Sequence, residues 1–493
     1  MSDGRPALTL VVIAVLLTAY RMWVIHHLGI DLYVDEAYYW GWSKALDWGY
    51  FSKPPVIAAM IAASTALFGD GLLAIKLPSL LSYPLAALVI FRLGTLMFDT
   101  RVGFWSGLAF LTMPLVGALG LFVSTDAPLL LFWSLGMLAL WHALHEDGGW
   151  RHWLVLGLAV GLGLLTKYTM AAFLPSALLV MLAGASGRRA LAGPRPWVAL
   201  LLAVLVFAPN LWWNWTHDFP TFRHTADITQ LDENSDGRNN LGEFLAGQWL
   251  SMGPALFLCM LWAIVRAIVR VRDPVWRLLL GMSLPLLALV SVQALRGGAN
   301  SNWAAPAFVA GVLLSVGWLG DTGRWRTLMV AVALNLLLVS GVYHWPDIAR
   351  GAGIEITRGK DPYKRARGWH ELAQAVAPVL TAHPNAILVA RERDLLAHLI
   401  YFLGPREYAS WNPRGRVIDH YQLTTNLAAA RGRDLLFVSR EPLDDAVLDR
   451  FDSSRDLGER VVRVHRDFAR RVHLYLLRGF RGYDAAALSS APG

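Results

Sequence analysis

The stretch from Asp35 to Pro55, DEAYYWGWSKALDWGYFSKPP, follows directly after the first long apolar segment of the 493-residue chain. It begins with two neighbouring carboxylates, Asp35 and Glu36, and also contains seven aromatic residues, Lys53 and a Pro-Pro pair. Acids beside a bilayer are costly unless they are paired or functional, whereas aromatic rings are stable at the membrane boundary. We therefore interpret the stretch as an active-site loop at a membrane surface. The alternative is an aromatic anchor with two solvated acids.

The composition is that of a membrane protein. Hydrophobic residues make up 55% of the chain and charged residues 16%, whereas soluble domains carry about 25% charged residues. The net charge is +8, but the arginines fall between apolar segments and in the C-terminal part. Membrane orientation and anionic headgroups therefore explain them better than nucleic acid does. The single cysteine, Cys259, excludes a disulfide framework, and the first apolar run shows no clear signal-peptide cleavage site.

Apolar segments of nearly membrane-spanning length, about 20 residues, recur along the first two thirds of the chain. We expect eleven spans, at 7–27, 75–97, 103–122, 127–144, 152–167, 170–185, 196–213, 250–270, 275–295, 303–319 and 325–343. The shorter segment 55–69 is predicted to be a helix lying at the membrane interface. Arginine-rich connections then share the side of the N terminus, which the positive-inside rule assigns to the cytoplasm. Most of the unusual polar groups fall on the opposite, periplasmic side.

The composition changes at about Trp345, where arginines and acids become frequent and apolar spans end. Two apolar runs are typical of short buried strands, namely Ala386–Ala390 and Leu435–Val438. Two other segments show a helical pattern, namely Trp369–Leu380 and Asp394–Leu403. The sequence thus predicts a membrane domain at 1–344 and a small α/β domain at 345–493, outside the membrane on the periplasmic side.

Three carboxylates are candidates for the catalytic site: Asp35, Glu36 and Asp126. Asp35 is the candidate base, with Glu36 in a supporting role, because neighbouring side chains on a helix or strand face different directions. Asp126, within the sequence STDAP, places another carboxylate on the same predicted face. The alternative role for Asp126 is to cap the helix that follows.

Three cations are candidates for binding a phosphate: Lys53, Lys167 and Arg296. A lysine offers a point charge, and an arginine offers a charge that is fixed at all relevant pH values. The alternatives are that Lys167 extends to the headgroups and that Arg296 anchors a helix end.

Aromatic rings and amides suit sugars, by stacking and by hydrogen bonding. The predicted substrate-binding residues are Tyr39, Tyr50, Trp213, Asn214, His217, His224 and Asn302. His217 and His224 lack a firm metal-ligand spacing, so we expect satisfied interfacial histidines there. The sequence names no cofactor and leaves a divalent-metal requirement open.

The order of these motifs resembles the GT-C glycosyltransferases. More narrowly, it is similar to bacterial relatives of the protein O-mannosyltransferases and of the aminoarabinose transferase that modifies lipid A (glycosyltransferase family 39 and 83 type). The resemblance covers roughly residues 7–320 and rests on Asp-Glu after the first span, Gly-Tyr-Phe-x-Lys-Pro-Pro at 49–55, Leu-Pro-Ser at 77–79, Thr-Asp at 125–126 and Leu-Thr-Lys at 165–167.

The resemblance implies a polyprenyl-phosphate sugar donor, an outward-facing site and inversion at the anomeric carbon. It matches Asp35 to the family's first-loop acid and Lys53 to its Lys-Pro-Pro lysine. The chain departs from the lipid A enzyme type at Ser52, where that type carries a glutamate. This departure weakens both a metal site that uses the glutamate and an assignment to aminoarabinose transfer.

We therefore expect a multi-span α-helical membrane protein of the GT-C type, with about 11 transmembrane helices, interfacial helices in the first outer loop and a small C-terminal α/β domain. In a bacterial inner membrane it would transfer a sugar to lipid A or another envelope glycan, lipid or protein. Asp35 would take the proton of the acceptor hydroxyl, and the three cations would stabilise the departing phosphate. Asp126 would orient the acceptor or tune Asp35.

The main alternative is a lipid-linked sugar flippase or transporter. Such a protein is expected to carry charged groups near the bilayer midplane and internal repeats, but here the ionisable residues gather on one face and the sequence shows no repeat. A membrane scaffold is a third interpretation, and it leaves the Asp35–Pro55 stretch without a purpose. The sequence does not determine the sugar, the acceptor or the oligomeric state.

Overall fold

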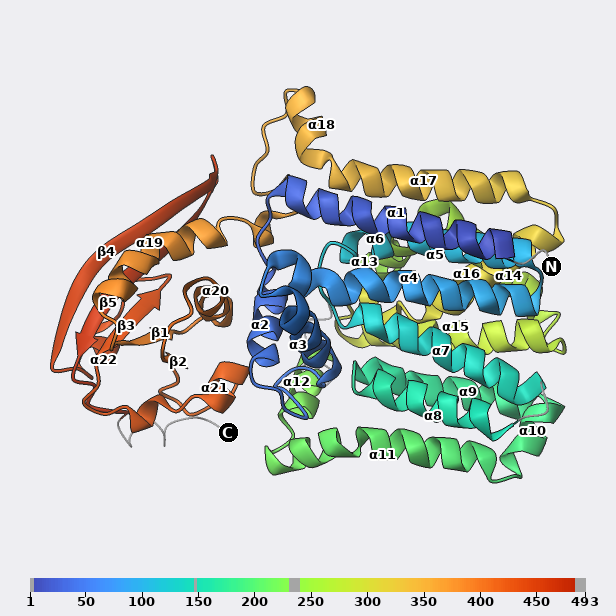
Figure 1. Cartoon of the computed structure of the whole chain (residues 1–493), viewed down its shortest axis with the longest axis horizontal. Coiled ribbons are helices and arrows are strands. Elements are labelled where there is room, and N and C mark those ends of the chain that lie inside the picture. Colours follow the sequence, from blue (N-terminus) through green and yellow to red (C-terminus); the bar gives the residue numbers. More distant parts are fainter. Residues whose placement is uncertain (1–3, 146–148, 230–239, 484–493) are drawn as a thin grey trace. The chain divides into compact units, whose positions relative to one another are not determined.

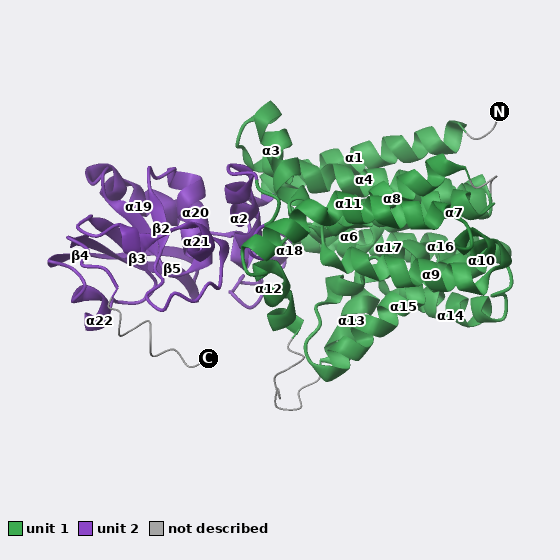
Figure 2. Cartoon of the chain, turned by 90° about the horizontal axis from the view of Figure 1, so that it is seen from below, with its two compact units in different colours: residues 1–27, 47–49, 53–345 green, residues 28–46, 50–52, 346–493 purple. Residues whose placement is uncertain are grey.

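The computed structural model describes residues 4–145, 149–229 and 240–483. It divides into two compact units (Figure 2). The first unit contains residues 1–27, 47–49 and 53–345, and the second contains 28–46, 50–52 and 346–493. The chain thus changes unit near residue 345, where the composition changes. In addition, most of the stretch that carries Asp35 belongs to the second unit, which the sequence did not indicate.

The first unit is a bundle of helices that run alternately in opposite directions (Figure 1). Its elements are α1 (Gly4–Leu28), α3 (Val56–Phe68), α4 (Leu72–Met97), α5 (Thr100–Thr112), α6 (Pro114–Leu119), α7 (Asp126–His145), α8 (Trp150–Leu164), η1 (Tyr168–Ala172), α9 (Phe173–Ala183), α10 (Ala185–Leu191), α11 (Arg195–Thr216), α12 (Pro220–Thr229), α13 (Leu241–Met252), α14 (Pro254–Ile268), α15 (Pro274–Arg296), η2 (Ser301–Ala304), α16 (Ala307–Asp321) and α17 (Trp325–Tyr343).

Fewer helices meet the length of a span than the eleven segments predicted. Within the described residues, six are long and apolar enough, namely α1, α4, α7, α11, α15 and α17, and the number rises to eight if each of two bent pairs counts as one span. The bent pairs are Tyr168–Ala183 with α10, at 114°, and α13 with α14, at 104°. Helices α8 and α16 have 15 residues each. The predicted helical membrane fold is therefore confirmed, whereas the predicted number of eleven spans is not.

Two backbone features explain where the predicted spans are interrupted. The segment 103–122 breaks into α5 and α6 because Pro114 lacks an N–H and holds Met113 in an extended conformation, with ψ of 135°. The segment 250–270 begins inside α13, and the chain turns at Gly253, whose φ is 94°. A Cβ there would also collide with the side-chain amide of Asn335, so only glycine fits.

The two ends of the bundle differ in charge. The connections α4–α5, α10–α11, α14–α15 and α16–α17 and the start of α8 lie at the end of the bundle where α1 begins (Figure 1). They carry Arg101, Arg151, Arg188, Arg189, Arg195, Arg266, Arg270, Arg272, Arg277, Arg324 and Arg326. The arginine-rich connections therefore share one end, as the charge pattern suggested. Assignment of that end to the cytoplasm stays a prediction.

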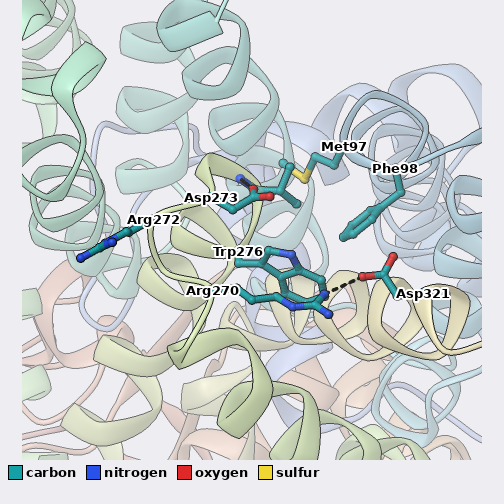
Figure 3. Close-up of a pocket in the computed structure, with 8 residues that line it drawn as sticks. Met97, Phe98, Arg270, Arg272, Asp273, Trp276 and Asp321 are labelled. Carbon is teal, nitrogen blue, oxygen red and sulfur yellow. Dashed lines mark hydrogen bonds and ion pairs between the residues drawn. The ribbon is translucent and has the colours of Figure 1, made fainter.

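A pocket of about 400 Å³ lies at this arginine-rich end, between the ends of α4 and α16 and the α14–α15 turn (Figure 3). Arg270 donates a hydrogen bond to Oδ2 of Asp321 at 2.8 Å, and its guanidinium lies 5.3 Å from the ring centroid of Trp276. The pocket is lined in part by two arginines and two aspartates, whose charges offset one another, and none of the predicted site residues lines it.

The second unit is built around a five-stranded mixed sheet with the strand order β2-β1-β3-β5-β4. Its elements are α2 (Val34–Ser43), α18 (Trp345–Gly351), η3 (Lys364–Ala366), α19 (Trp369–Ala382), β1 (Ile387–Ala390), α20 (Arg393–Leu403), β2 (Tyr408–Ser410), α21 (His420–Thr424), η4 (Leu427–Ala429), β3 (Leu435–Ser439), α22 (Asp445–Leu448), β4 (Ser453–His465) and β5 (Phe468–Arg478). Strands β2, β1 and β3 are parallel to one another, β5 is antiparallel to β3, and β4 is antiparallel to β5.

The predicted strands and helices of this unit are present as β1, β3, α19 and α20. Every residue of β1 and β3 is buried, which explains their uniformly apolar sequences. The β4–β5 hairpin was not predicted, because β4 is mostly exposed and rich in charged residues.

The segment before α2 is anchored in the second unit by buried polar contacts. The backbone N–H of Trp369 donates to Asp31 at 2.8 Å, and Nε2 of His398 lies 3.0 Å from the carbonyl oxygen of Leu32. Burial lowers the pKa of His398 to about 4, although the carbonyls of Asp394 and Leu32 act in the opposite direction. The imidazole is therefore neutral near pH 7, and it stacks on the Trp369 ring at 3.8 Å.

We predict that Gly103→Ala destabilises the bundle. An added Cβ at Gly103 would lie 2.5 Å from the carbonyl oxygen of Phe91 and against Oγ1 of Thr95, so α4 and α5 would have to separate. Overpacking of this kind costs about 1–3 kcal/mol. The measurement is the thermal unfolding midpoint in detergent, which should fall.

The matched control is Gly242→Ala in α13, where a Cβ would meet nothing within 4 Å. Alanine is a better helix former than glycine, so this midpoint should stay the same or rise. Equal midpoints for the two variants would contradict the close packing of α4 on α5.

Candidate functional site

Three predicted residues from distant parts of the first unit meet at one carboxylate. Lys167, in the α8–η1 connection, contacts Oδ1 of Asp126 with its Nζ at 2.7 Å. Asn302, in η2, donates from Nδ2 to Oδ2 of the same carboxylate at 2.8 Å. The side chains of Asp126 and Lys167 are 4% and 12% exposed. Because both oxygens of Asp126 have partners, the geometry favours a positioning role for it.

The loop before α7 fixes Asp126 against α4. The backbone N–H of Ser124 donates to Oγ of Ser79 at 3.0 Å, and a lysine that the sequence analysis did not select, Lys76, packs nearby. Lys76 is fully buried, and its Nζ lies 4.9 Å from the centroid of the Phe122 ring. The sequence did hold a signal that could have pointed to Lys76, because this lysine directly precedes the Leu-Pro-Ser motif.

Of the two predicted sugar-binding residues of α11, Trp213 holds a segment of the first loop and Asn214 contacts η1. Nε1 of Trp213 donates to Oδ2 of Asp47 at 2.7 Å, and a Cβ at Gly49 would collide with the Trp213 ring. Asn214, fully buried, donates from Nδ2 to the hydroxyl of Tyr168 at 3.2 Å. These contacts argue for a structural role for Trp213 and Asn214.

The two predicted histidines lie at the end of α11 and in α12. His217 ends α11 and stacks on Trp213, with ring centroids 4.4 Å apart. His224 lies half-buried in α12. Within the described ranges, no group of three or more His, Cys, Asp or Glu side chains is arranged to hold a metal ion.

The other two candidate cations also lie in the first unit. Lys53 is half-buried just before α3, and the backbone N–H of Val56 donates to the carbonyl oxygen of Leu165 at 3.0 Å. This hydrogen bond ties the Lys-Pro-Pro segment to the chain two residues before Lys167. Arg296 is exposed in the last turn of α15.

Asp35 lies in the second unit, where it pairs with a residue that sequence reasoning missed. Oδ1 of Asp35 contacts Nη2 of Arg393 at 3.2 Å, and the two side chains are 40% and 35% exposed. The Arg393 guanidinium also lies 4.8 Å from the ring centroid of Tyr38. Arg393 begins α20, 358 residues along the chain from Asp35, so no local pattern could have indicated the pair.

Three other predicted residues of this stretch are buried. Glu36 accepts a hydrogen bond from the backbone N–H of Tyr33 at 2.7 Å and so caps α2, which agrees with a supporting role. Tyr39 is 5% exposed and Tyr50 is fully buried, with its ring stacked on Trp42 at 4.6 Å. This burial argues against direct contact of either tyrosine with a sugar.

Comparison with known proteins identifies relatives of this chain. Residues 52–213 match the family model of dolichyl-phosphate-mannose-protein mannosyltransferases. Lipid A galacturonosyltransferase RgtD of Rhizobium johnstonii is 33% identical over 428 residues, which are 86% of this chain and 89% of the relative. The undecaprenyl phosphate-alpha-4-amino-4-deoxy-L-arabinose arabinosyl transferase of Pseudomonas savastanoi pv. phaseolicola is 33% identical over 130 residues, 26% of this chain and 24% of the relative.

The fold is similar to that of a solved structure, ArnT from Cupriavidus metallidurans bound to undecaprenyl phosphate, with a TM-score of 0.62 and 16% identity over 100% of both chains. This likeness shows a helical GT-C fold, and the identity with the galacturonosyltransferase extends over most of both sequences. The chain therefore belongs to the GT-C glycosyltransferases of the lipid A and aminoarabinose transferase type, integral-membrane enzymes that transfer a sugar from a polyprenyl-phosphate donor.

Proposed function

We propose that this enzyme transfers a galacturonosyl group from a polyprenyl-phosphate donor to lipid A, with inversion at the anomeric carbon. One contrast carries the proposal. The identity with the galacturonosyltransferase spans 86% of the chain, whereas the identity with the aminoarabinosyltransferase spans 26%. The resemblance also implies that the aminoarabinose-transferring type carries a glutamate at the position of Ser52. This departure likewise argues against aminoarabinose transfer.

We propose that the reaction takes place at the periplasmic face of the inner membrane. Asp126 begins α7 and Lys167 lies between α8 and η1, and these helix ends lie at the opposite end of the bundle from the arginine-rich turns (Figure 1). Positive residues favour the cytoplasmic side, which supports this orientation. A site on the periplasmic side would meet a donor whose sugar head has already crossed the membrane.

Asp35 is the proposed general base. It is partly exposed, Arg393 contacts its Oδ1, and in the described part of the chain no hydrogen bond engages its Oδ2. Oδ2 would accept the proton of the acceptor hydroxyl as that oxygen bonds to the anomeric carbon. The bond between that carbon and the phosphate oxygen breaks, and polyprenyl phosphate leaves with the electron pair. A phosphate leaving group needs no protonated acid, so one carboxylate suffices, in contrast to the pair in a glycosidase.

Lys53 and Lys167 are the proposed partners of the departing phosphate, with Arg296 as a third cation. A charge held in place before the reaction stabilises a developing charge without reorganisation. The pairing of Lys167 with Asp126, whose other oxygen accepts from Asn302, supplies such a hold. In this proposal, Asp126 positions Lys167 and takes no proton itself.

We predict that Asp35→Asn lowers the rate of sugar transfer by about 100- to 10,000-fold, the usual contribution of a general base. The substitution keeps the size of the side chain and removes the proton acceptor. The measurement is the initial rate with labelled donor in detergent-solubilised enzyme. The control, Asp449→Asn on the exposed end of α22, should leave the rate unchanged. Normal transfer by Asp35→Asn would end the assignment.

We predict that the double variant Lys167→Met/Asp126→Asn folds but loses transfer by about 100-fold or more. Removing Lys167 alone would leave a buried charge and cost about 3–5 kcal/mol, so the double variant separates chemistry from folding. Both kcat/KM and the unfolding midpoint are measured.

The matched control neutralises the half-exposed pair Arg270 and Asp321 at the arginine-rich end. An exposed pair contributes about 0–1 kcal/mol, so transfer should persist there. Full activity of the Lys167→Met/Asp126→Asn enzyme would remove Lys167 from the mechanism.

We predict that lipid A incubated with the enzyme and galacturonosyl polyprenyl phosphate gains a uronic acid, detected by mass spectrometry. A parallel reaction with the aminoarabinosyl donor should give at most a trace of product. Transfer of aminoarabinose without galacturonic acid would overturn the proposed sugar. Transfer of galacturonic acid to another envelope glycan only would overturn the proposed acceptor.

A further inference from the structure

We propose that Arg393 binds the carboxylate of the transferred uronic acid and thereby determines the sugar that the enzyme accepts. This inference rests on the proposed galacturonosyl transfer and assigns the selectivity to one side chain. Arg393 lies in the second unit, in contact with the candidate base Asp35, so it is placed beside the group that acts on the acceptor.

Two helices hold Arg393 and Asp35 in register. Arg393 is the first residue of α20, Asp35 lies in the first turn of α2, and the two helices pack against each other. The ring centroids of Trp40 and Tyr401, one on each helix, are 4.9 Å apart. The position of Arg393 is therefore set by the fold of the second unit rather than by its own flexible stem.

The surroundings of Arg393 favour a charged, partly accessible guanidinium. It packs over the ring of Tyr38, which is itself fully buried and accepts a hydrogen bond from the backbone N–H of His420. The buried carboxylate of Asp419 adds a negative potential. With 35% of its side chain exposed, Arg393 is both fixed and open to a ligand.

The contact with Asp35 uses a small part of the donor capacity of Arg393. A guanidinium offers five N–H donors in a planar fork that matches a carboxylate at two points. Among the described residues, Arg393 makes one such hydrogen bond, from Nη2 to Oδ1 of Asp35 at 3.2 Å. The rest of the fork can therefore take a second carboxylate.

A uronic acid carries a carboxylate where a neutral hexose carries a hydroxymethyl group. Bringing this negative sugar to a carboxylate base is opposed by like-charge repulsion, which a shared cation offsets. When the sugar carboxylate engages Arg393, the ion pair with Asp35 weakens and Asp35 becomes a better proton acceptor. With a neutral sugar, Arg393 stays on Oδ1 of Asp35 and makes no charged contact with the donor.

The test compares two donors, galacturonosyl and galactosyl polyprenyl phosphate, in the full-length enzyme and in Arg393→Gln. We expect the native enzyme to prefer the galacturonosyl donor. Arg393→Gln should lower kcat/KM for that donor by roughly 10- to 100-fold, the value of a hydrogen bond to a charged group. Its kcat/KM for the galactosyl donor should change by less than about 3-fold, so the preference falls.

A purely structural role for Arg393, or one that acts only through Asp35, would lower kcat/KM for both donors by the same factor and would overturn the inference. Arg393→Lys keeps the charge but not the fork, and it should also reduce the preference. The control Arg391→Gln neutralises a neighbouring arginine, which lies 3.7 Å from Asp444 and is 38% exposed, and it should leave the preference intact.

The sugar that the native enzyme transfers tests the proposed function separately. If it transfers another sugar and no galacturonic acid, the proposed function fails and the inference fails with it. If it transfers galacturonic acid and Arg393→Gln keeps the native preference, only the assignment of Arg393 fails.

Discussion

A buried ion pair organises the polar end of the first unit. Lys167 and Asp126 meet at 2.7 Å with almost no exposure, and Asn302 completes the coordination of the carboxylate. Removal of one partner from such a pair leaves an uncompensated charge and costs about 3–5 kcal/mol. The start of α7, the end of α8 and η2 are therefore constrained to meet at one point. Apolar packing alone would leave these helix ends less precisely placed.

The first loop depends on the same end of the bundle. Its residues 47–49 are held by α11 through Asn210, which donates to the carbonyl oxygen of Trp48 at 2.7 Å, and through Trp213. The Lys-Pro-Pro segment is held by Leu165 through Val56. The residues before and between these points belong to the second unit. The Trp213 side chain, which looked suited to sugar binding in the sequence, thus contributes to fixing the loop.

Properties encoded locally could be predicted from the sequence, and properties created by folding could not. The buried strands β1 and β3 follow from short apolar runs, and the helices α19 and α20 follow from helical periodicity. The break at Pro114 has a local cause that a count of apolar residues does not detect. The turn at Gly253 depends on Asn335, which lies 82 residues further along the chain, so it needed the structure.

The candidate site divides in the same way. Asp35, Asp126 and Lys167 were selected because charged residues beside apolar spans are rare and informative. Their partners were not predicted: Asp126 pairs with a lysine 41 residues away, and Asp35 with an arginine 358 residues away. Tyr50 differs from these residues, since its aromatic ring is fully buried, and its contact with a sugar stays a prediction. Residue type indicates which chemistry is available, whereas burial decides which groups can use it.

The two ion pairs differ in exposure, and this difference matches the roles proposed for them. The Lys167–Asp126 pair is 12% and 4% exposed, whereas the Arg393–Asp35 pair is 35% and 40% exposed. An exposed pair contributes about 0–1 kcal/mol, so a substrate can take over one partner at little cost. A proton-accepting group must change partners in every turnover, which requires such a weak pair. A group that stabilises a departing phosphate works best when it does not move at all, and only the buried pair meets that condition.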